Sequence, residues 1–254
     1  MLTALNSGES GVSAQQTALD LTANNIANVN TPGYKEAVPD FADLIYRQIR
    51  SDQPPNQAPL VGQGMRVTGT HALLTEGTLI ATGRSLDLAI DGKGFFQVTT
   101  ADGQSAYTRD GTLQVSADGK LVTSGGQVLE PQISVPPGAE VSITTDGRVL
   151  AKLGQQGAVS QIGQITLTTF TNPPALNKIG DSLYQPNGNS GAPVAGMAGT
   201  GGFGLIRQGY QESANVDLAN AMTAMLEAQR AYQLNARVIT NADQMLGIAN
   251  NLRR

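Results

Sequence analysis

The chain of 254 residues has no cysteine and no tryptophan, and its single histidine is His71. Without cysteine, disulfide bonds and thiolate catalysis are excluded, although the redox compartment stays open. One histidine excludes zinc sites built from several imidazoles and leaves a single imidazole base. These absences exclude cysteine nucleophiles and zinc sites with several histidines.

Charge is also scarce. Charged residues make up 14% of the chain and the net charge is -4, whereas soluble domains average about 25% charged residues. No basic run is present that would neutralise a row of phosphates, so we expect no nucleic-acid binding. No apolar stretch approaches the ~18 residues of a membrane span, so we expect no membrane insertion. A surface with so little charge suits a protein that neighbours largely cover.

Motifs for cofactors are weak. Gly199-x-Gly201-x-x-Gly204 matches the dinucleotide-binding pattern in letters, but a Gly/Pro-rich loop precedes it where a strand is required. Five Asp-Gly pairs lack the closing Glu of a calcium loop, and turn chemistry explains them. We therefore predict no catalytic residue, no cofactor and no metal. The sequence alone does not exclude a carboxylate pair for sugar hydrolysis, because the fold sets such a pair.

The first 30 residues have a helical pattern. Apolar residues recur at intervals of seven, which is the seam spacing of a coiled coil. The residues between them are small and polar. The recurring positions are Leu5, Val12, Leu19 and Ile26.

The C-terminal part repeats this pattern more strongly. Asn215 or Asp217 is placed to cap a helix that runs to about Asn250, with Met222 and Ala236 on the adjoining heptad positions. The helix forms either a helix–helix seam or an amphipathic face packed on its own β domain. Its recurring positions are Leu218, Met225, Tyr232, Ile239 and Leu246.

Between the helices the pattern indicates antiparallel β structure. Asp-Gly pairs separate short apolar runs, and Asp-Gly between such runs is a strong hairpin signal. A Pro-rich extended loop is predicted at 51–64. The predicted strands lie at 86–90, 95–98, 112–115, 120–123, 140–143 and 165–170.

The stretch ANNIANVNTPGYK, residues 23–35, places asparagines at the end of the first helix and then stops it with Pro32-Gly33. Amide side chains donate and accept hydrogen bonds at once, so they can fix the register between packed helices. Alternatively, they cap the end of the helix. The residues concerned are Asn24, Asn25, Asn28 and Asn30, followed by the turn at Pro32, Gly33 and Tyr34.

Three segments, 23–35, 91–126 and 208–246, resemble the bacterial flagellar rod and hook proteins, the axial proteins of the flagellum. Together they appear in the family's order and extend the resemblance to nearly the whole chain. The length and AYQLNARVITNADQML (231–246) are most like the distal-rod members of that family. Proximal-rod and hook-type members remain alternatives. Tyr34 stands where the family usually has Phe, and the 51–64 loop is shorter than expected for the distal rod.

The resemblance implies an α+β fold. The N- and C-terminal helices, 1–34 and 212–254, would pair in a coiled-coil-like inner domain. Residues 35–79 would form an extended connecting arm, and residues 80–211 an inserted antiparallel β domain. The heptad residues with Asn24, Asn25 and Asn28 would form the subunit interface, and Pro32, Gly33 and Tyr34 would turn the chain out of the inner domain.

The resemblance also implies a structural subunit and no enzyme. The subunit would polymerise into a helical tube that transmits torque from motor to hook. Its partners would be other copies, proximal rod proteins, the hook protein and the P- and L-ring proteins. The flagellar type III apparatus would export it to the periplasm-spanning rod of the basal body, and residues 1–16 show no cleaved secretory signal. Other readings are a cell-wall hydrolase and a monomeric, secreted, β-rich binding module.

Overall fold

The computed structural model describes residues 2–48, 60–154 and 158–251. Its contacts divide the chain into two compact units. The helical unit contains residues 1–27, 37–72 and 216–254, and the β unit contains residues 28–36 and 73–215. Each unit is therefore built from separate parts of the sequence, and the α+β class is confirmed.

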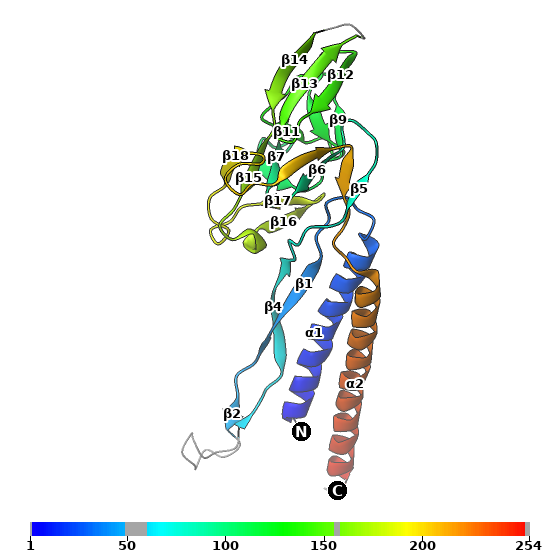
Figure 1. Ribbon diagram of the computed structural model, residues 1–254. Coiled ribbons are helices and arrows are strands. Elements are labelled where there is room, and N and C mark those ends of the chain that lie inside the picture. Colours follow the sequence, from blue (N-terminus) through cyan, green and yellow to red (C-terminus); the bar gives the residue numbers. More distant parts are fainter. Residues whose placement is uncertain (1, 49–59, 155–157, 252–254) are drawn as a thin grey trace. The chain divides into compact units, whose positions relative to one another are not determined.

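Two long helices dominate the helical unit (Figure 1). Helix α1 spans Leu2–Ala27 and helix α2 spans Leu218–Asn251. Asp217 caps α2, because its Oδ1 accepts hydrogen bonds from the backbone N–H groups of Ala219 (2.9 Å) and Asn220 (3.2 Å). Of the two caps expected from the sequence, Asp217 is the one used.

Small residues allow α1 and α2 to approach closely. A Cβ atom built at Gly8 would lie 2.9 Å from Cγ1 of Ile239, and one built at Gly11 would lie 2.6 Å from Nδ2 of Asn235. Position 8 meets position 239 and position 11 meets position 235, so the helices run antiparallel. Ala14 on α1 is also buried. The contact between the helices therefore depends on residues that barely project.

The predicted heptad residues lie at different depths in the helical unit. Leu5, Val12, Leu19 and Ile26 of α1 are partly buried, as are Met225, Tyr232, Ile239 and Leu246 of α2. Leu218 is 46% exposed. Met222, on an adjoining heptad position, is 56% exposed. The adjoining positions that are buried belong to alanines one residue earlier in the heptad, namely Ala221, Ala228 and Ala242.

A two-stranded antiparallel ribbon completes the described helical unit. Strand β1, Ala37–Asp43, pairs with β4, Met65–Ala72, with a register shift between Asp40 and Phe41. The short strands β2, Arg47–Gln48, and β3, Leu60–Val61, form a second antiparallel pair. Residues 51–59 of the predicted Pro-rich loop lie outside the described residues.

The β unit is built on a nine-stranded antiparallel sheet (Figure 1). Its main path runs β16-β17-β8-β7-β11-β10-β9, and β15 joins β7 to β18. The strands of this sheet are β7 (Phe95–Thr99), β8 (Ser105–Thr108), β9 (Leu113–Val115), β10 (Leu121–Thr123), β11 (Val128–Glu130), β15 (Thr166–Thr169), β16 (Asn177–Gly180), β17 (Leu183–Gln185) and β18 (Val194–Met197).

Smaller antiparallel groups accompany this sheet. Strands β12, β13 and β14 form a three-stranded sheet, while β6 pairs with β19 and β5 with β20. A short 3-10 helix spans Pro173–Ala175. The strands of these groups are β5 (Leu79–Ala81), β6 (Leu88–Asp91), β12 (Ala139–Ile143), β13 (Arg148–Leu153), β14 (Val159–Gln164), β19 (Leu205–Gln208) and β20 (Tyr210–Glu212).

All six predicted strands are confirmed, at β6, β7, β9, β10, β12 and β15. Asp-Gly turns close three hairpins, at 102–103, 118–119 and 146–147, where the glycines have positive φ. The pairs at 91–92 and 110–111 instead link strands that pair with other partners. Gly111 has no positive φ, but a Cβ there would lie 1.8 Å from the carbonyl oxygen of Leu88.

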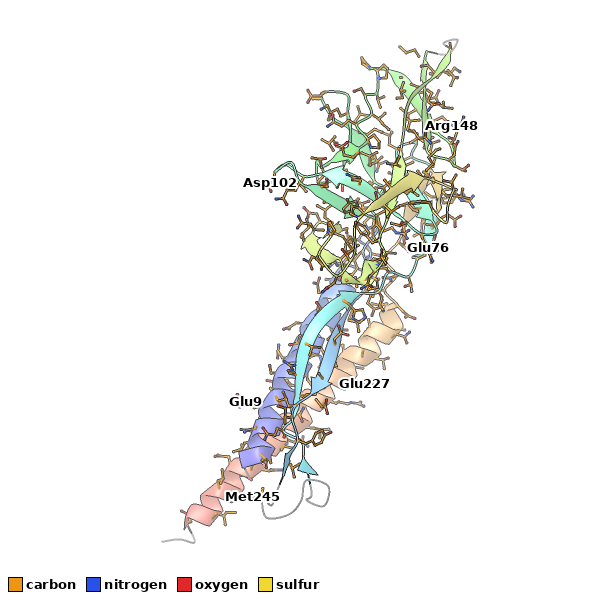
Figure 2. The ribbon with its side chains drawn as sticks, turned by 90° about the vertical axis from the view of Figure 1, so that its left-hand side faces the viewer. Glu9, Glu76, Asp102, Arg148, Glu227 and Met245 are labelled. Carbon is orange, nitrogen blue, oxygen red and sulfur yellow. The ribbon has the colours of Figure 1, made fainter. Side chains whose placement is uncertain are left out.

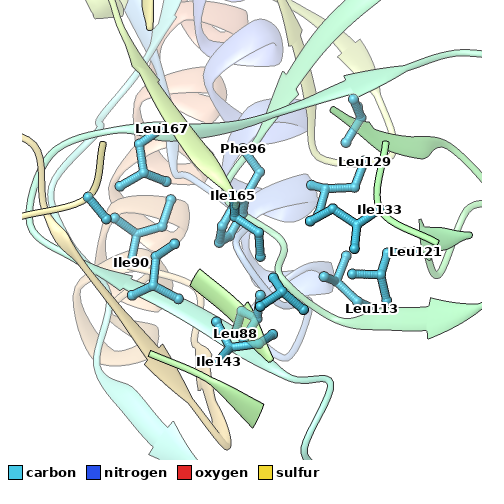
Figure 3. Close-up of a cluster of buried hydrophobic side chains, with 14 of the residues drawn as sticks. Leu88, Ile90, Phe96, Leu113, Leu121, Leu129, Ile133, Ile143, Ile165 and Leu167 are labelled. Carbon is cyan, nitrogen blue, oxygen red and sulfur yellow. The ribbon is translucent and has the colours of Figure 1, made fainter. Parts of the chain in front are cut away.

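One apolar core holds the β unit together (Figure 3). It collects side chains from the nine-stranded sheet, from β6 and from the β12–β13 hairpin. The fully buried members include Leu88, Ile90, Leu121, Leu129 and Leu167. Burying such side chains is worth about 1.5–3 kcal/mol each, so this core supplies the main stabilisation of the unit.

Candidate functional site

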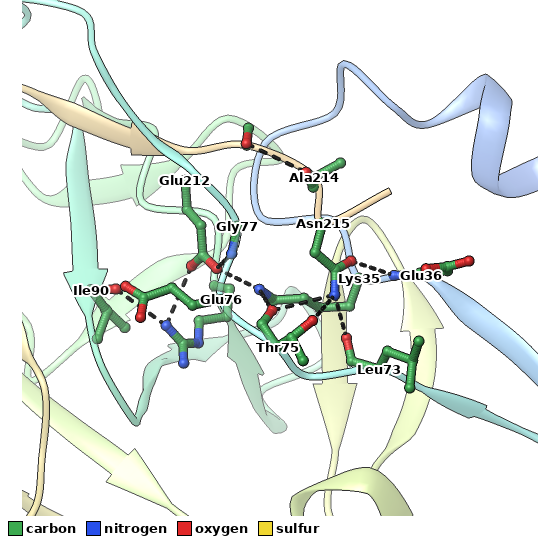
Figure 4. A network of polar contacts seen from close by, with 12 residues as sticks. Lys35, Glu36, Leu73, Thr75, Glu76, Gly77, Ile90, Glu212, Ala214 and Asn215 are labelled. Carbon is green, nitrogen blue, oxygen red and sulfur yellow. Dashed lines mark hydrogen bonds and ion pairs between the residues drawn. The ribbon is translucent and has the colours of Figure 1, made fainter. Parts of the chain in front are cut away.

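A cluster of buried charges lies in the β unit where three distant segments meet (Figure 4). The carboxylate of Glu212, in β20, forms an ion pair with the ammonium of Lys35 through Oε1. Its other oxygen, Oε2, lies 3.3 Å from Nη1 of Arg109. The side chains of Lys35 and Glu212 are fully buried and that of Arg109 is 6% exposed. One buried carboxylate thus pairs with two buried cations.

Backbone groups add further hydrogen bonds to the cluster. Lys35 Nζ donates to the carbonyl of Thr75 (2.7 Å), and the N–H of Gly77 donates to Oε1 of Glu212 (2.9 Å). Arg109 donates to the carbonyls of Ile90 (3.3 Å) and Gly92 (2.7 Å). The cluster therefore joins the loop before β5 to β20 and to the end of β6. Its charges are engaged by protein groups, as a structural network requires.

Burial changes the titration of Lys35. Desolvation lowers the pKa of the Lys35 ammonium, and the negative charge of Glu212 opposes that shift. Removing one partner from a buried ion pair leaves an uncompensated charge, which typically costs about 3–5 kcal/mol. The cluster is therefore a point where a single substitution acts strongly.

The predicted turn residues pack beside this cluster. Gly33 has φ +63°, and a Cβ there would lie 2.5 Å from the backbone nitrogen of Asp110 and 2.7 Å from the carbonyl carbon of Arg109. The N–H of Gly33 donates to the carbonyl of Glu212 (2.9 Å). Only glycine combines this backbone conformation with this close approach. Pro32, the preceding residue, is partly buried.

Tyr34 is buried and carries a cation on its ring. The Lys178 ammonium lies 3.6 Å from the ring centroid, a cation–π contact. Burial lowers the pKa of Lys178 to about 8 and raises the pKa of Tyr34. Tyr34 thereby joins the strand β16 to the segment that carries Lys35.

The asparagines near the end of α1 make contacts within the chain. The Asn25 side chain is buried, donates to the carbonyl of Ala37 (2.8 Å) and accepts from its N–H (3.0 Å). Asn28 accepts a hydrogen bond from the Thr31 hydroxyl (3.1 Å) in the turn. Asn24 is exposed. Asn25 thus fixes the first residue of β1, and a role of these amides between subunits stays a prediction.

Asn215 does not cap α2 but ties segments of the β unit together. Its Oδ1 accepts from the N–H of Glu36 (2.8 Å), and its Nδ2 donates to the carbonyl of Leu73 (2.7 Å) and the hydroxyl of Thr75 (2.8 Å). The segments before β1, after β4 and before α2 are therefore bonded to one another.

Sequence reasoning missed Lys35, Arg109 and Glu212. Their only signal is that each is a charge within one of the three segments that carry the resemblance, in a chain with little charge. Among the described residues, no group of three or more His, Asp or Glu side chains is placed to hold a metal ion. The helices described here include none that is both long enough and apolar enough to cross a membrane.

Three segments of the chain match models of known protein families. Residues 5–35 match the family model "Flagella basal body rod protein". Residues 89–151 match "Flagellar hook protein FlgE/F/G D1 domain", and residues 207–252 match "Flagellar basal body rod FlgEFG protein C-terminal". Each matched segment contributes one member of the ion cluster. The chain belongs to the family of flagellar basal-body rod proteins.

Within this family the chain is similar to proteins named "Flagellar basal-body rod protein FlgG". The one from Agrobacterium fabrum is 41% identical over 256 residues, with 97% of this chain and 98% of the relative covered. The one from Borreliella burgdorferi is 38% identical over 264 residues and covers both chains completely. A "Flagellar basal-body rod protein FlgF" from Caulobacter vibrioides is 35% identical over 248 residues, with 92% of each chain covered.

Proposed function

We propose that this chain is a structural subunit of the distal flagellar rod, which polymerises into a helical tube that transmits torque from the motor to the hook. The full-length similarity to rod proteins named FlgG supports the rod assignment. The ion cluster fits a structural role, because protein groups engage its charges. No reaction is assigned to the chain.

One structural observation supports polymerisation most directly. Helix α2 leaves seven large apolar side chains exposed in its described part, although it is already paired with α1. Large apolar side chains left exposed along one helix fit a surface that neighbouring subunits cover. The side chains and their exposed fractions are Leu218 46%, Met222 56%, Leu226 55%, Leu234 61%, Val238 43%, Met245 50% and Ile248 61%.

The helix pair, the ribbon and the export route also belong to this proposal. The pair of α1 and α2 acts as a coiled-coil-like inner domain, and the ribbon of β1 and β4 belongs to an extended arm that contacts neighbouring subunits. The heptad residues take part in assembly. The chain is exported without a cleaved signal by the flagellar type III apparatus and meets proximal rod proteins, the hook protein and the P- and L-ring proteins in the periplasm.

Electron microscopy and sedimentation of the purified chain test the polymer. We expect tubes from the wild-type chain and none from Leu234→Asp, because this exposed side chain lies on a helix surface available to neighbours. Leu153→Asp is the matched control, since Leu153 is 55% exposed but lies on β13. Tubes from Leu234→Asp that match the wild type would contradict the role of this helix surface.

Ile239→Asp provides a second test of the polymer. Ile239 lies against Gly8 within the same chain, so its charge would disturb the α1–α2 pair as well as assembly. We expect Ile239→Asp to block tubes and to lower helix stability, whereas Leu234→Asp blocks tubes alone. The melting of the β unit should be unchanged in both variants.

A further inference from the structure

The contact between Gly11 and Asn235 defines the inner side of each helix in the helical unit. A Cβ at Gly11 would lie 2.6 Å from Nδ2 of Asn235, so these positions face each other. Successive residues of a helix advance by about 100°. The direction of every other side chain around its helix follows from its distance in sequence to these two positions.

The outer side of α1 is acidic. Asp20 is nine residues from Gly11, which places it about 180° around the helix, and Glu9 lies within about 20° of Asp20. Both are exposed, and Figure 2 labels Glu9 on α1. Gln16 donates a hydrogen bond to Asp20 (3.3 Å). Among the described residues neither carboxylate has an ion pair.

The outer side of α2 is basic at its centre. Arg237 and Arg230 lie about 160° and 140° around the helix from Asn235, and both are exposed. Neither guanidinium has an ion pair within the described chain. The acidic residues Glu227 and Asp243 each lie only about 80° from Asn235, on the two flanks near α1. Exposed Leu226 lies about 180° from Asn235, beside the arginines, and exposed Leu234 lies about 100° from it, on the same flank as Glu227.

We propose that the acidic outer side of α1 in one copy docks against the basic outer side of α2 in the next copy. The two surfaces point in opposite directions from the α1–α2 contact, so they do not reach each other within one chain. Their charges are complementary and both lack ion partners in the described chain. A contact between two different surfaces of identical copies is heterologous and leaves each new copy ready for another.

This docking rests on the proposed polymer and names the surfaces that build it. Charge complementarity chiefly sets which surfaces meet and in which register. Exposed Leu226 beside the arginines supplies apolar area to the same contact. The occupant of the basic surface is therefore a second copy of this chain, which presents the matching acidic surface.

Charge reversal tests the pairing. Asp20→Lys and Arg237→Glu should each raise severalfold the concentration at which the purified chain polymerises. The two changes together should restore assembly toward that of the wild type, because the docking charges are exchanged and remain complementary. Asp102→Lys, in an exposed turn of the β unit, and Lys93→Glu are matched reversals that should leave assembly unchanged.

Cross-linking supplies a second readout. The chain has no cysteine, so copies with Asp20→Cys mixed with copies with Arg237→Cys should form a mixed disulfide that neither forms alone, when molecular oxygen with a copper catalyst is added to take up the two electrons. Asp102→Cys replaces Asp20→Cys in the control mixture and should give no mixed disulfide.

The outcomes separate this docking from the polymer itself. A wild-type chain that stays monomeric would overturn the proposed polymer and this docking with it. If the wild type polymerises, single reversals without effect would overturn the docking alone. So would a double reversal no better than the single ones, or equal cross-linking in the control mixture.

Discussion

The Lys35 ammonium and the Glu212 carboxylate, 177 positions apart in the chain, form an ion pair with no exposed side-chain surface. Arg109 joins them from a third part of the sequence. Such a contact has no local origin, because its members meet only when the β unit is folded. It therefore reports on the tertiary structure rather than on any single strand.

Glu212→Gln should destabilise the β unit by about 3–5 kcal/mol, because the buried cations Lys35 and Arg109 would lose the carboxylate that pairs with both of them. The change keeps the size and shape of the side chain. Urea unfolding of the full chain, followed by the β-sheet circular dichroism signal, measures the effect.

The control for this change is Glu227→Gln. Glu227 is exposed on α2, so we expect its replacement to shift stability by no more than about 0.5 kcal/mol. Equal effects of the two substitutions would show that the ion cluster contributes nothing special to the fold.

Gly33→Ala and Gly83→Ala separate two costs of replacing a glycine. Both positions have positive φ, +63° and +72°, which an alanine adopts at a cost of about 1–2 kcal/mol. Only at Gly33 would the new Cβ also meet backbone atoms, those of Arg109 and Asp110, whereas nothing lies within 4 Å at Gly83. Thermal unfolding should show a clearly larger loss for Gly33→Ala. Similar losses would mean that the turn does not pack as described.

Gly8→Leu and Gly247→Leu should change the helical unit in opposite directions. Leucine favours a helix over glycine by up to about 1 kcal/mol, and at Gly247 nothing lies within 4 Å of the added Cβ. At Gly8 the Cβ would lie 2.9 Å from Ile239, and overpacking of this kind costs about 1–3 kcal/mol. Thermal melting followed by the helical circular dichroism signal measures both effects. A higher melting temperature for Gly8→Leu than for the wild type would contradict this prediction.

Much of the fold could be predicted because its signals are local. Alternating apolar residues and Asp-Gly pairs predicted the strands, and the two candidate caps, Asn215 and Asp217, predicted the start of α2, where Asp217 is the one used. The contact between the helices was predicted less well, because the heptad pattern takes account of large apolar residues alone. The helices instead approach closely at Gly8 and Gly11, and a glycine gives no heptad signal because it has no side chain.

The candidate site was predictable in part, for the same reason. The turn at Pro32-Gly33 is predictable because it depends on two adjacent residues. Gly33 is required there both for its positive φ and for its close approach to the backbone of Arg109 and Asp110. The ion cluster was missed because Lys35, Arg109 and Glu212 are each ordinary in their local sequence. Burial, which makes them unusual, depends on strands that lie far apart in the chain.

Lys178 should make stability depend on pH in the alkaline range. Its pKa is lowered from 10.5 to about 8 in the folded chain, so between these values the unfolded chain binds more protons and stability rises with pH. Lys178→Met keeps the apolar contact with Tyr34 and removes the titration. The rise between about pH 8 and pH 9.5 should therefore be smaller in this variant, with the remainder due to Lys35, whose pKa is also lowered.

Urea midpoints measured across this range provide the test. The window ends near pH 9.5 because tyrosines ionise in the unfolded chain at about pH 10, and the raised pKa of Tyr34 and Tyr107 then reverses the sign. A slope for Lys178→Met that equals the wild-type slope would show that this lysine titrates normally.

The order of the three cluster residues along the chain means that the β unit can fold only when the chain extends as far as Glu212. Both cations, Lys35 and Arg109, are synthesised before the carboxylate of Glu212. A product that stops short of residue 212 would have to bury two positive charges with nothing to neutralise them. Truncated chains that lack Glu212 would therefore fail to form the native β unit, because Lys35 and Arg109 would lose their shared carboxylate.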